Sequence, residues 1–371
     1  MIGILICAGL TAGASEFDIQ VLATNGSDPD LVNAWGLTAS PTSPFWIGAN
    51  GSGKALVYNG AGTKLGLTVT IPGDGSVTGA TFNGSSGFDG DSFLFASEDG
   101  TVSGWRGALG TAAETLVGAD PSSVYKGIAD ASVGGFDYAY LANFRTGAID
   151  VLKGEGGAPD LAGSFTDPDL PAGYAPFDVQ NLGGVLYVTY AVQDAAKKDD
   201  VAALGNGIVD TFDLNGNFLG RVVTGGLLDS PWGLAIAPAG FGDVGGDLLV
   251  GNFGNGRINA YNPTTGTFVE TLAGAGGTAL TIDGLWGLRF GNGGAAGSTQ
   301  TLYFTAGPND EQDGAFGDIT SPVGSTVPEP ATWVLLSAAL VCLCCGRIVG
   351  NDRLNQSSHR RDSEDVPGAD C

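Results

Sequence analysis

Cysteine is missing from most of this chain. The five cysteines are Cys7, Cys342, Cys344, Cys345 and Cys371. None of them falls between residues 8 and 341, so this part has no disulfide, no thiolate nucleophile and no thiolate metal site. Histidine occurs once, at His359, which excludes a histidine-based catalytic triad and a histidine-ligated metal from the same part.

Basic residues are also scarce. The chain has 15 Lys and Arg against 39 Asp and Glu, and its net charge is −24. A surface this acidic repels phosphate backbones and anionic lipids, which excludes nucleic acid as a partner. The charge suits a secreted protein or a protein that meets cations.

Glycine is the residue that is abundant, with 64 copies in 371 residues. The copies show no collagen-like period, and 43% of the residues are hydrophobic, which argues against disorder. Many short apolar runs are separated by Gly-containing segments. This pattern predicts an all-β protein of short strands joined by tight turns.

The chain contains a repeat built around a Trp-Gly-Leu triplet. Full copies lie at 35–37, 232–234 and 286–288, and weaker copies lie at 78–80, 126–128 and 177–179. Their central residues are 43 to 55 residues apart. Self-similarity at this period in an all-β chain is typical of a β-propeller with four strands per blade. Six copies predict a six-bladed propeller, NHL- or lactonase-like, over residues 15–320.

Two segments stand outside the regular repeat. The last repeat lacks a clear fourth strand, so we expect the strand at 17–22 to pair with the sixth blade and close the ring. The fourth repeat carries an insertion at 193–206, which we expect to form a mobile loop over one face of the ring.

The turns within the repeats carry the candidate site residues. They bring polar side chains toward one face of the ring, namely Asn50, Glu98, Asp99, Asn143, Asn252, Asn309 and Asp310. This set resembles the Glu, Asn and Asp ligands of six-bladed propeller lactonases, which implies a Ca²⁺ or Zn²⁺ site, and oxygen ligands suit Ca²⁺. The alternative is that Asn and Asp are simply favourable turn residues beside Gly.

Two other features have both a structural and a functional interpretation. The acidic segment 309–314 crowds three carboxylates before a glycine, but it lacks the spacing of an EF-hand loop, so it is either a solvated turn or a Ca²⁺ ligand. The triplet residues Trp35, Trp232 and Trp286 either pack between blades or stack on sugars. In the packing interpretation, the glycine that follows each Trp allows close backbone approach.

Both ends of the chain have the pattern of targeting segments. Residues 1–14 contain an apolar run and a small-x-small pattern before Ser15, which predicts a signal peptide, although no basic residue precedes the run. The alternative is a buried first strand. Near the other end, Pro328-Glu329-Pro330 is followed by an apolar segment at 333–347 that ends in Arg347.

This C-terminal arrangement resembles the PEP-CTERM sorting signal of Gram-negative bacteria that make exopolysaccharide. The resemblance implies recognition and cleavage near Pro328-Glu329-Pro330 by a membrane-embedded exosortase, with transient membrane association through 333–347. Residues 321–332 would then be a linker. An ordinary C-terminal membrane anchor is the alternative, although the run is short for a span of about 20 residues. The polar tail at 348–371, expected to be disordered, departs from the usual ending of that signal.

The central part also resembles an uncharacterised family of secreted, exosortase-associated proteins. The resemblance rests on Ala34-Trp35-Gly36-Leu37, on the turn at 251–256 and on 309–314. It implies fold and location but no activity, no catalytic residue and no cofactor.

Two functions follow as hypotheses. One is an exported, non-enzymatic binding or structural protein at the cell surface or in the extracellular matrix, in contact with exopolysaccharide or surface proteins. The alternative is a Ca²⁺-dependent propeller hydrolase of the lactonase type.

Overall fold

The structure is a computed structural model that describes residues 15–321. The predicted signal peptide at 1–14, the Pro-Glu-Pro motif, the apolar segment at 333–347 and the tail at 348–371 lie outside these residues. Within them, the only helical segments are five 3₁₀ turns of three residues each. None of the helices in 15–321 has the length and apolar character needed to cross a bilayer.

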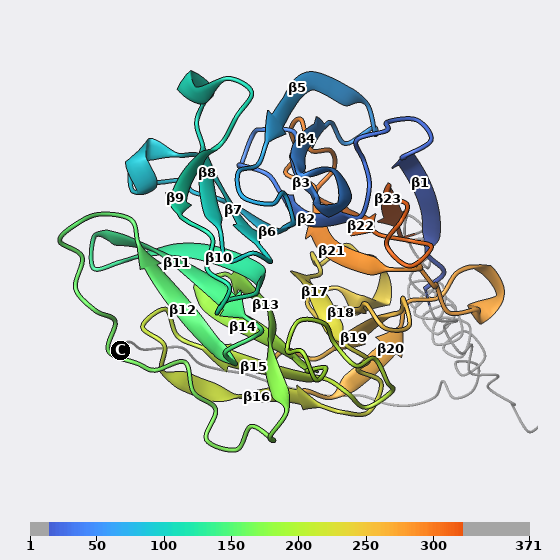
Figure 1. The fold of residues 1–371 in the computed structure, drawn as a ribbon. Coiled ribbons are helices and arrows are strands. Elements are labelled where there is room, and N and C mark those ends of the chain that lie inside the picture. The colour runs from blue at the N-terminus through green and yellow to red at the C-terminus, as the bar shows by residue number, and fades with distance from the viewer. Residues whose placement is uncertain (1–14, 322–371) are drawn as a thin grey trace, which may run out of the picture. The chain divides into compact units, whose positions relative to one another are not determined.

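The described chain forms six antiparallel sheets arranged in a ring, with the first strand of each repeat at the centre (Figure 1). The first three blades consist of β2 (Ala34–Thr38), β3 (Phe45–Ala49), β4 (Lys54–Tyr58) and β5 (Lys64–Thr70); β6 (Val77–Phe82), β7 (Phe93–Ser97), β8 (Val102–Trp105) and β9 (Glu114–Val117); and β10 (Tyr125–Val133), β11 (Phe136–Asn143) and β12 (Ala148–Lys153).

The other three blades complete the ring. They consist of β13 (Tyr174–Leu182), β14 (Val185–Val192), β15 (Ile208–Phe212) and β16 (Phe218–Thr224); β17 (Pro231–Ile236), β18 (Leu248–Asn252), β19 (Ile258–Tyr261) and β20 (Phe268–Thr271); and β21 (Leu285–Phe290), β22 (Thr301–Ala306), β23 (Ala315–Thr320) and β1 (Asp18–Thr24). The predicted six-bladed propeller is therefore confirmed.

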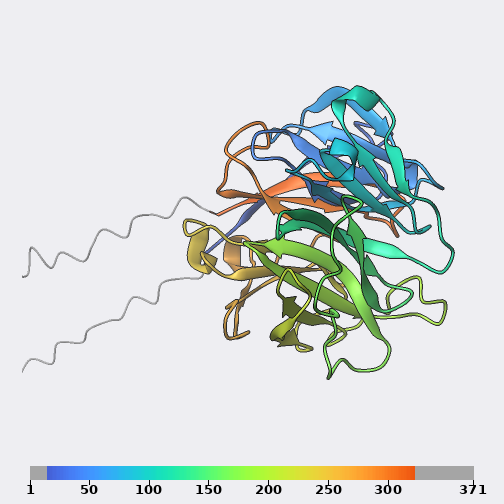
Figure 2. The same ribbon diagram turned by 90° about the vertical axis from the view of Figure 1, so that its left-hand side faces the viewer.

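The ring is closed by the first strand, as the sequence predicts. β1 pairs antiparallel with β23, from Asp18 opposite Thr320 to Thr24 opposite Ala315. Both ribbon views show this blue strand beside the red end of the coloured chain (Figures 1 and 2). The sixth blade thus takes strands from both ends of the propeller, and the pairing covers the edge that β23 would otherwise expose.

The third blade differs from the prediction of four strands in every blade. Its sheet has three strands, and the segment 154–173 that follows β12 forms no fourth one. Glycine at 156 and 157 and proline at 159, 168 and 171 explain the difference, because they disfavour strand backbone and remove donors. The segment instead donates from the amides of Gly163 and Phe165 to the β15–β16 turn of the next blade.

Glycines let the inner strands of neighbouring blades approach each other closely. A Cβ atom at Gly36 would lie 2.4 Å from the carbonyl oxygen of Thr78, and one at Gly233 would lie 2.4 Å from that of Trp286. The predicted reason for a glycine after each Trp is thereby confirmed. The pairing register of the inner strands also shifts at this point, as between Ala34 and Leu37. Such bulges re-aim side chains.

Candidate functional site

Aromatic side chains from several blades meet at the centre of the ring. This group, called here the aromatic plug, consists of Trp35, Phe144, Phe177, Trp232, Phe253 and Trp286. The rings of Trp35 and Trp286 stack with centroids 3.6 Å apart, and Trp232 meets Trp286 edge-on at 5.9 Å. The three tryptophans are no more than 2% exposed. They therefore pack against one another across the axis and offer no open face on which a sugar could stack.

Lys126 takes the place of a tryptophan in the third repeat. It is the second residue of β10, as Trp35 is of β2, and its Nζ lies 5.1 Å from the centroid of the Trp35 ring. Its carbonyl oxygen accepts a hydrogen bond of 3.2 Å from the Trp232 indole. A cation over the face of an indole is stabilised by the ring quadrupole. Lys126 therefore places a positive charge against the aromatic plug, at the position that tryptophan occupies in three of the other inner strands.

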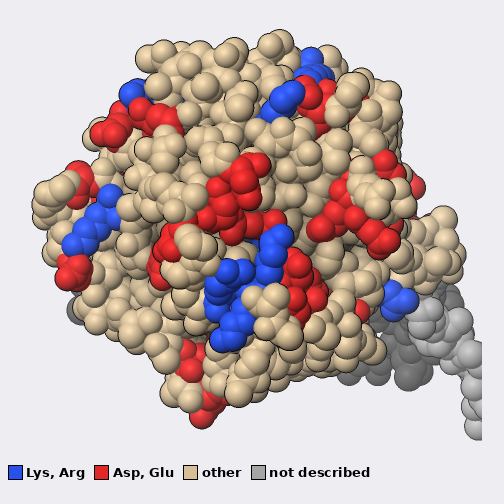
Figure 3. Space-filling view, viewed as in Figure 1, with Lys and Arg blue, Asp and Glu red and all other residues tan. Residues whose placement is uncertain are grey.

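Carboxylates and a second lysine surround this ammonium group. We call Glu98, Lys126, Lys198, Asp199 and Glu311 the central charge cluster. Nζ of Lys126 forms an ion pair with Glu98 and lies 3.3 Å from Oδ1 of Asp199, while Nζ of Lys198 lies 3.7 Å from Oε2 of Glu98. The Lys126 side chain is 3% exposed and that of Glu98 is 11% exposed. Figure 3 shows acidic and basic side chains gathered near the middle of one face.

The cluster shifts the pKa values of its members in a consistent way. Burial alone would lower the pKa of Lys126, but the carboxylates of Glu98 and Asp199 raise it above its usual value, so the lysine is charged. Burial raises the pKa of Glu311 to about 6; Glu98 and Asp199 add to this rise, and Lys126 opposes it. The cluster thus holds one firmly charged ammonium and one carboxyl that titrates near neutral pH.

An unusual turn presents Glu311 to the cluster. Asn309, Asp310 and Glu311 have φ values of 60°, 51° and 64°, in the left-handed region that favours glycine. The turn is held by hydrogen bonds from the Glu311 amide to Gly307 and from Gln312 to Asn309. Three successive non-glycine residues in this region store backbone strain, which tends to occur at functional sites.

The insertion at 193–206 supplies the exposed side of the cluster. Its start folds back on itself, with Gln193 paired to Asp200, while Oδ1 of Asp194 accepts from the amides of Lys198 and Asp199. Nε2 of the Gln193 side chain also donates to the carbonyl oxygen of Phe144. The predicted loop over one face is present, and these hydrogen bonds place Asp199 beside Lys126.

Asn143 and Asn252, two of the predicted ligands, are turn residues. Oδ1 of Asn143 accepts from the amides of Val124 and Thr146, and its Nδ2 donates to Asp150 at 2.8 Å. Nδ2 of Asn252 donates to the carbonyl oxygen of Leu227 at 2.8 Å. Both are fully buried. Their amides hold the chain around the β11–β12 and β18–β19 turns, as the turn interpretation predicts.

The other predicted residues are distributed around the same face. Oδ1 of Asn50 accepts a 3.4 Å bond from Asn33, and the exposed Asn309 donates from Nδ2 to Asp313 at 3.3 Å. Asp310 is exposed. Asp99 accepts from the backbone amides of Asp74 and Thr101. Glu98 alone of the seven predicted residues joins the central charge cluster. Sequence reasoning missed Lys126 as a site residue, although its place in the triplet, where other repeats have Trp, was a usable signal.

The acidic residues among the predicted ligands do not form a metal-binding cluster. Within residues 15–321, no group of three or more His, Cys, Asp or Glu side chains is arranged to hold a metal ion. The Asn143 oxygen already accepts two backbone amides. Ca²⁺ requires six to eight oxygens around one point, and the Asn143 oxygen is already engaged by these amides.

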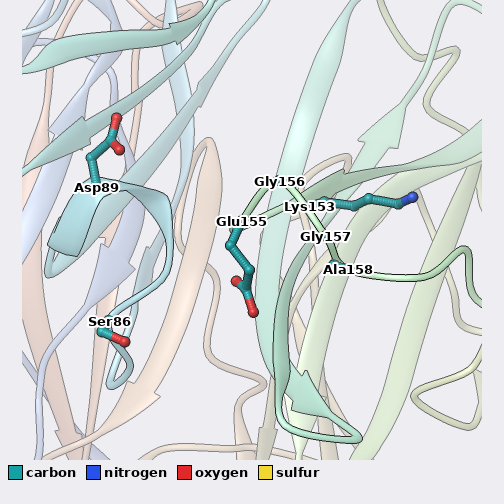
Figure 4. Close-up of a pocket in the computed structure, with 8 residues that line it drawn as sticks. Ser86, Asp89, Lys153, Glu155, Gly156, Gly157 and Ala158 are labelled. Atoms are coloured by element: carbon teal, nitrogen blue, oxygen red, sulfur yellow. The ribbon is translucent and has the colours of Figure 1, made fainter.

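A separate pocket lies away from the ring centre, between the β6–β7 connection and the end of β12. Its volume is about 630 Å³, and Ser86, Asp89, Lys153 and Glu155 contribute to its lining. Figure 4 shows that Lys153 and Glu155 point in different directions. Lys153 pairs instead with Asp160, at 2.7 Å. The polar groups of this pocket therefore do not converge on a common point.

Comparisons with solved structures give distant likenesses. The structure of a streptogramin B lyase covers 82% of this chain and 98% of its own, with 15% identity and a TM-score of 0.47. Regucalcin, a calcium-binding protein of Agrobacterium tumefaciens, covers 85% of this chain and 97% of its own, with 13% identity and a TM-score of 0.48. No family model matches the sequence.

Curated relatives are nearer in sequence. An uncharacterised protein of Acanthamoeba polyphaga mimivirus is 32% identical over 322 residues, which is 79% of this chain and 76% of the relative. A second uncharacterised protein of the same virus is 31% identical over 81% of this chain and 83% of the relative. The chain therefore belongs to the family of these uncharacterised mimivirus proteins.

Proposed function

We propose that this protein is an exported, non-enzymatic binding or structural module of the cell surface or extracellular matrix, sorted through an exosortase. The observation that carries the binding role is the aromatic plug. Trp35, Trp232 and Trp286 pack against one another at the centre of the ring and are no more than 2% exposed. A partner must then contact the face of the ring rather than enter it at the plug.

The central charge cluster supports the same role. The charged Lys126 forms ion pairs with Glu98 and Asp199 and lies against the ring of Trp35. These ion pairs hold the inner strand β10 and the insertion at 193–206 in place, so this face of the propeller is a rigid surface. With a net charge of −24, the protein suits neutral polysaccharide chains or basic surface proteins better than polyanions.

The proposed route to the surface depends on the two ends of the chain. Residues 1–14 would direct export, and Pro328-Glu329-Pro330 with the apolar segment 333–347 and Arg347 would be read by the exosortase. The membrane association through 333–347 would be transient. A rigid ring ending at β23 suits such processing, because cleavage beyond residue 321 leaves every blade intact.

The sorting step is tested with the full chain in a bacterial host that has an exosortase. We expect wild type to lose its C-terminal segment and reach the cell surface. Replacing Pro328, Glu329 and Pro330 together with alanine should leave the protein uncut in the membrane fraction, and the control Pro322→Ala should behave as wild type. Intact mass and cell fractionation are the readouts. Equal processing of the triple variant would refute the exosortase route.

The binding role is tested on the protein released from the same cells. We expect it to sediment with exopolysaccharide purified from that host, whereas an acidic protein of similar size and charge stays in the supernatant. A protein that remains in the supernatant with the control would contradict the matrix role, whatever the outcome of the sorting experiment.

A further inference from the structure

The end of the ring axis opposite the aromatic plug has a different character. The inner strands β13 and β21 carry the plug residues Phe177 and Trp286 near their starts and run on from the plug. Arg289 lies three residues beyond Trp286, and Gln180 lies three beyond Phe177. At about 3.3 Å per residue, these side chains start about 10 Å farther along the strands. They therefore belong to the second mouth of the ring.

A pocket of about 420 Å³ opens at this mouth between the fourth, fifth and sixth blades. Its lining includes Gln180, Asn181, Leu234, Leu288, Arg289 and Phe290. It joins an apolar wall from β17 and β21 to amide and guanidinium groups from β13 and β21. Small-molecule sites have this size and this combination of apolar walls with a few polar groups.

The guanidinium of Arg289 is the group that points to a ligand. Its one hydrogen bond to the described residues runs from NH2 to the carbonyl oxygen of Ala39, at 3.0 Å. Among residues 15–321, no carboxylate lies within salt-bridge distance of it, whereas the partly buried Arg106 and Arg221 each have carboxylate partners. Burial lowers the pKa of Arg289, and Asp130 opposes this. A desolvated arginine without an ion-pair partner is costly unless an anion completes it.

The acidic group whose charge acts on Arg289 is already engaged. Oδ1 of Asp130 accepts a 2.6 Å hydrogen bond from the Thr81 hydroxyl, and its carbonyl oxygen accepts from Asn181 at 3.0 Å. Asp130 thus affects Arg289 through space without capturing the guanidinium. In a chain of net charge −24, this mouth is a place where a positive group faces a pocket with free donor capacity.

We propose that this second-mouth pocket binds a small carboxylic acid that carries hydroxyl groups, with Arg289 on the carboxylate and Gln180 on a hydroxyl. The fork of an arginine matches a carboxylate in a bidentate pair. The side chains of Leu234, Leu288 and Phe290 provide an apolar surface for the carbon skeleton. A uronic acid has this chemistry, either as the free sugar or as the end of a saccharide chain. The site does not depend on the proposed export or sorting.

Calorimetric titration of the full chain tests the site, with sodium glucuronate as the probe and glucose as the matched sugar without a carboxylate. We expect glucuronate to bind and glucose to bind at least roughly tenfold more weakly, because a charge-assisted pair is lost. A disaccharide ending in glucuronate distinguishes the free acid from a chain end, and binding of either supports the site.

Two variants assign the binding to these residues. Arg289→Gln should weaken glucuronate binding roughly tenfold or more, and the exposed control Arg257→Gln should leave it unchanged. Gln180→Leu should weaken it less and serves if Arg289→Gln does not fold, as judged by its melting curve. Equal binding of glucose and glucuronate, no binding of either acid, or full binding by both pocket variants would overturn the site. Sedimentation with exopolysaccharide is a separate measurement, so either proposal can fail alone.

Discussion

The ammonium group of Lys126 lies 5.1 Å from the centroid of the Trp35 ring and forms an ion pair with Glu98. One lysine thus joins the aromatic plug to the central charge cluster and connects the first three blades. Removing this lysine would leave Glu98, which is only 11% exposed, without its closest cation.

Lys126→Met should lower the free energy of unfolding by about 2–4 kcal/mol, because it leaves a poorly solvated carboxylate unpaired. Urea unfolding measures the change. The matched control is Lys153→Met, since the pair of Lys153 with Asp160 is largely exposed and its loss should have no measurable effect. Adding Glu98→Gln to Lys126→Met should recover part of the loss. Equal stability of the two lysine variants would contradict the role of the buried pair.

Glu311 should make stability depend on pH in a specific direction. Its folded pKa of about 6 is above the usual 4.5, so the folded state binds the proton more tightly than the unfolded state. Its contribution is therefore fully present below pH 4.5 and is lost as the pH rises through 6. Glu311→Gln should remove this loss. The difference in unfolding free energy between the variant and wild type should therefore be about 1 kcal/mol more favourable to the variant at pH 7 than at pH 4.5.

The measurement for Glu311 is the difference in unfolding free energy between variant and wild type, followed from pH 4.5 to 7. Asp310→Asn, at the exposed neighbour in the same turn, is the control for any disturbance of the turn itself. A flat difference for Glu311→Gln would show that its carboxyl is not desolvated in the folded protein.

The close approach of the inner strands predicts a marked difference between two glycines. Gly36→Ala would place a Cβ atom 2.4 Å from the Thr78 carbonyl oxygen and should destabilise the protein by about 3 kcal/mol. Gly66 in β5 has open space around the same position, so Gly66→Ala should change stability by no more than about 1 kcal/mol. Thermal unfolding of both variants decides the matter, and similar melting temperatures would refute the packing argument.

Closure by β1 predicts that the first strand is needed for stability. A protein beginning at residue 25 should unfold at a lower urea concentration than one beginning at residue 15, because β23 loses its pairing along 18–24. The two proteins differ only by the segment that contains β1, so the longer one is the control. Coinciding transitions would mean that the ring does not depend on this strand.

Calcium should leave the melting temperature unchanged at millimolar concentration. The Asn143 oxygen already accepts two backbone amides, and residues 15–321 contain no acidic cluster arranged to hold a metal ion. A ligand that binds only the folded state would raise the melting temperature. A rise with Ca²⁺ that Asn143→Ala abolishes would restore the calcium-dependent hydrolase hypothesis.

Much of the fold could be predicted because it depends on local patterns. The sequence repeats the triplet around Trp35 and the Gly-containing turns every 43 to 55 residues. The strand expected at 17–22 belongs to none of these repeats, which indicates that it closes the ring. The three-stranded third blade was not predicted, because the absence of its fourth strand depends on which groups accept hydrogen bonds from residues 154–173. That segment donates to the β15–β16 turn of the next blade, which is a long-range choice.

The candidate site could be predicted only in part. The sequence placed Glu98 on the correct face, because turns between the second and third strands of all blades share one face. It could not say that the side-chain amides of Asn143 and Asn252 are taken up by hydrogen bonds to neighbouring turns and loops. Nor could it show that Lys126 and Asp199, far apart in the chain, meet at 3.3 Å.

By itself, then, the sequence determined the six-bladed ring, its closure and the face that carries the turns, because these follow from periodicity and from the need to cover strand edges. The tertiary structure decided what occupies the axis. Whether Trp35, Trp232 and Trp286 line a channel or fill it depends on how side chains from opposite blades pack. The same packing decides that Lys126 has carboxylate partners and that Arg289 has none among residues 15–321. Such contacts join residues that no local pattern relates.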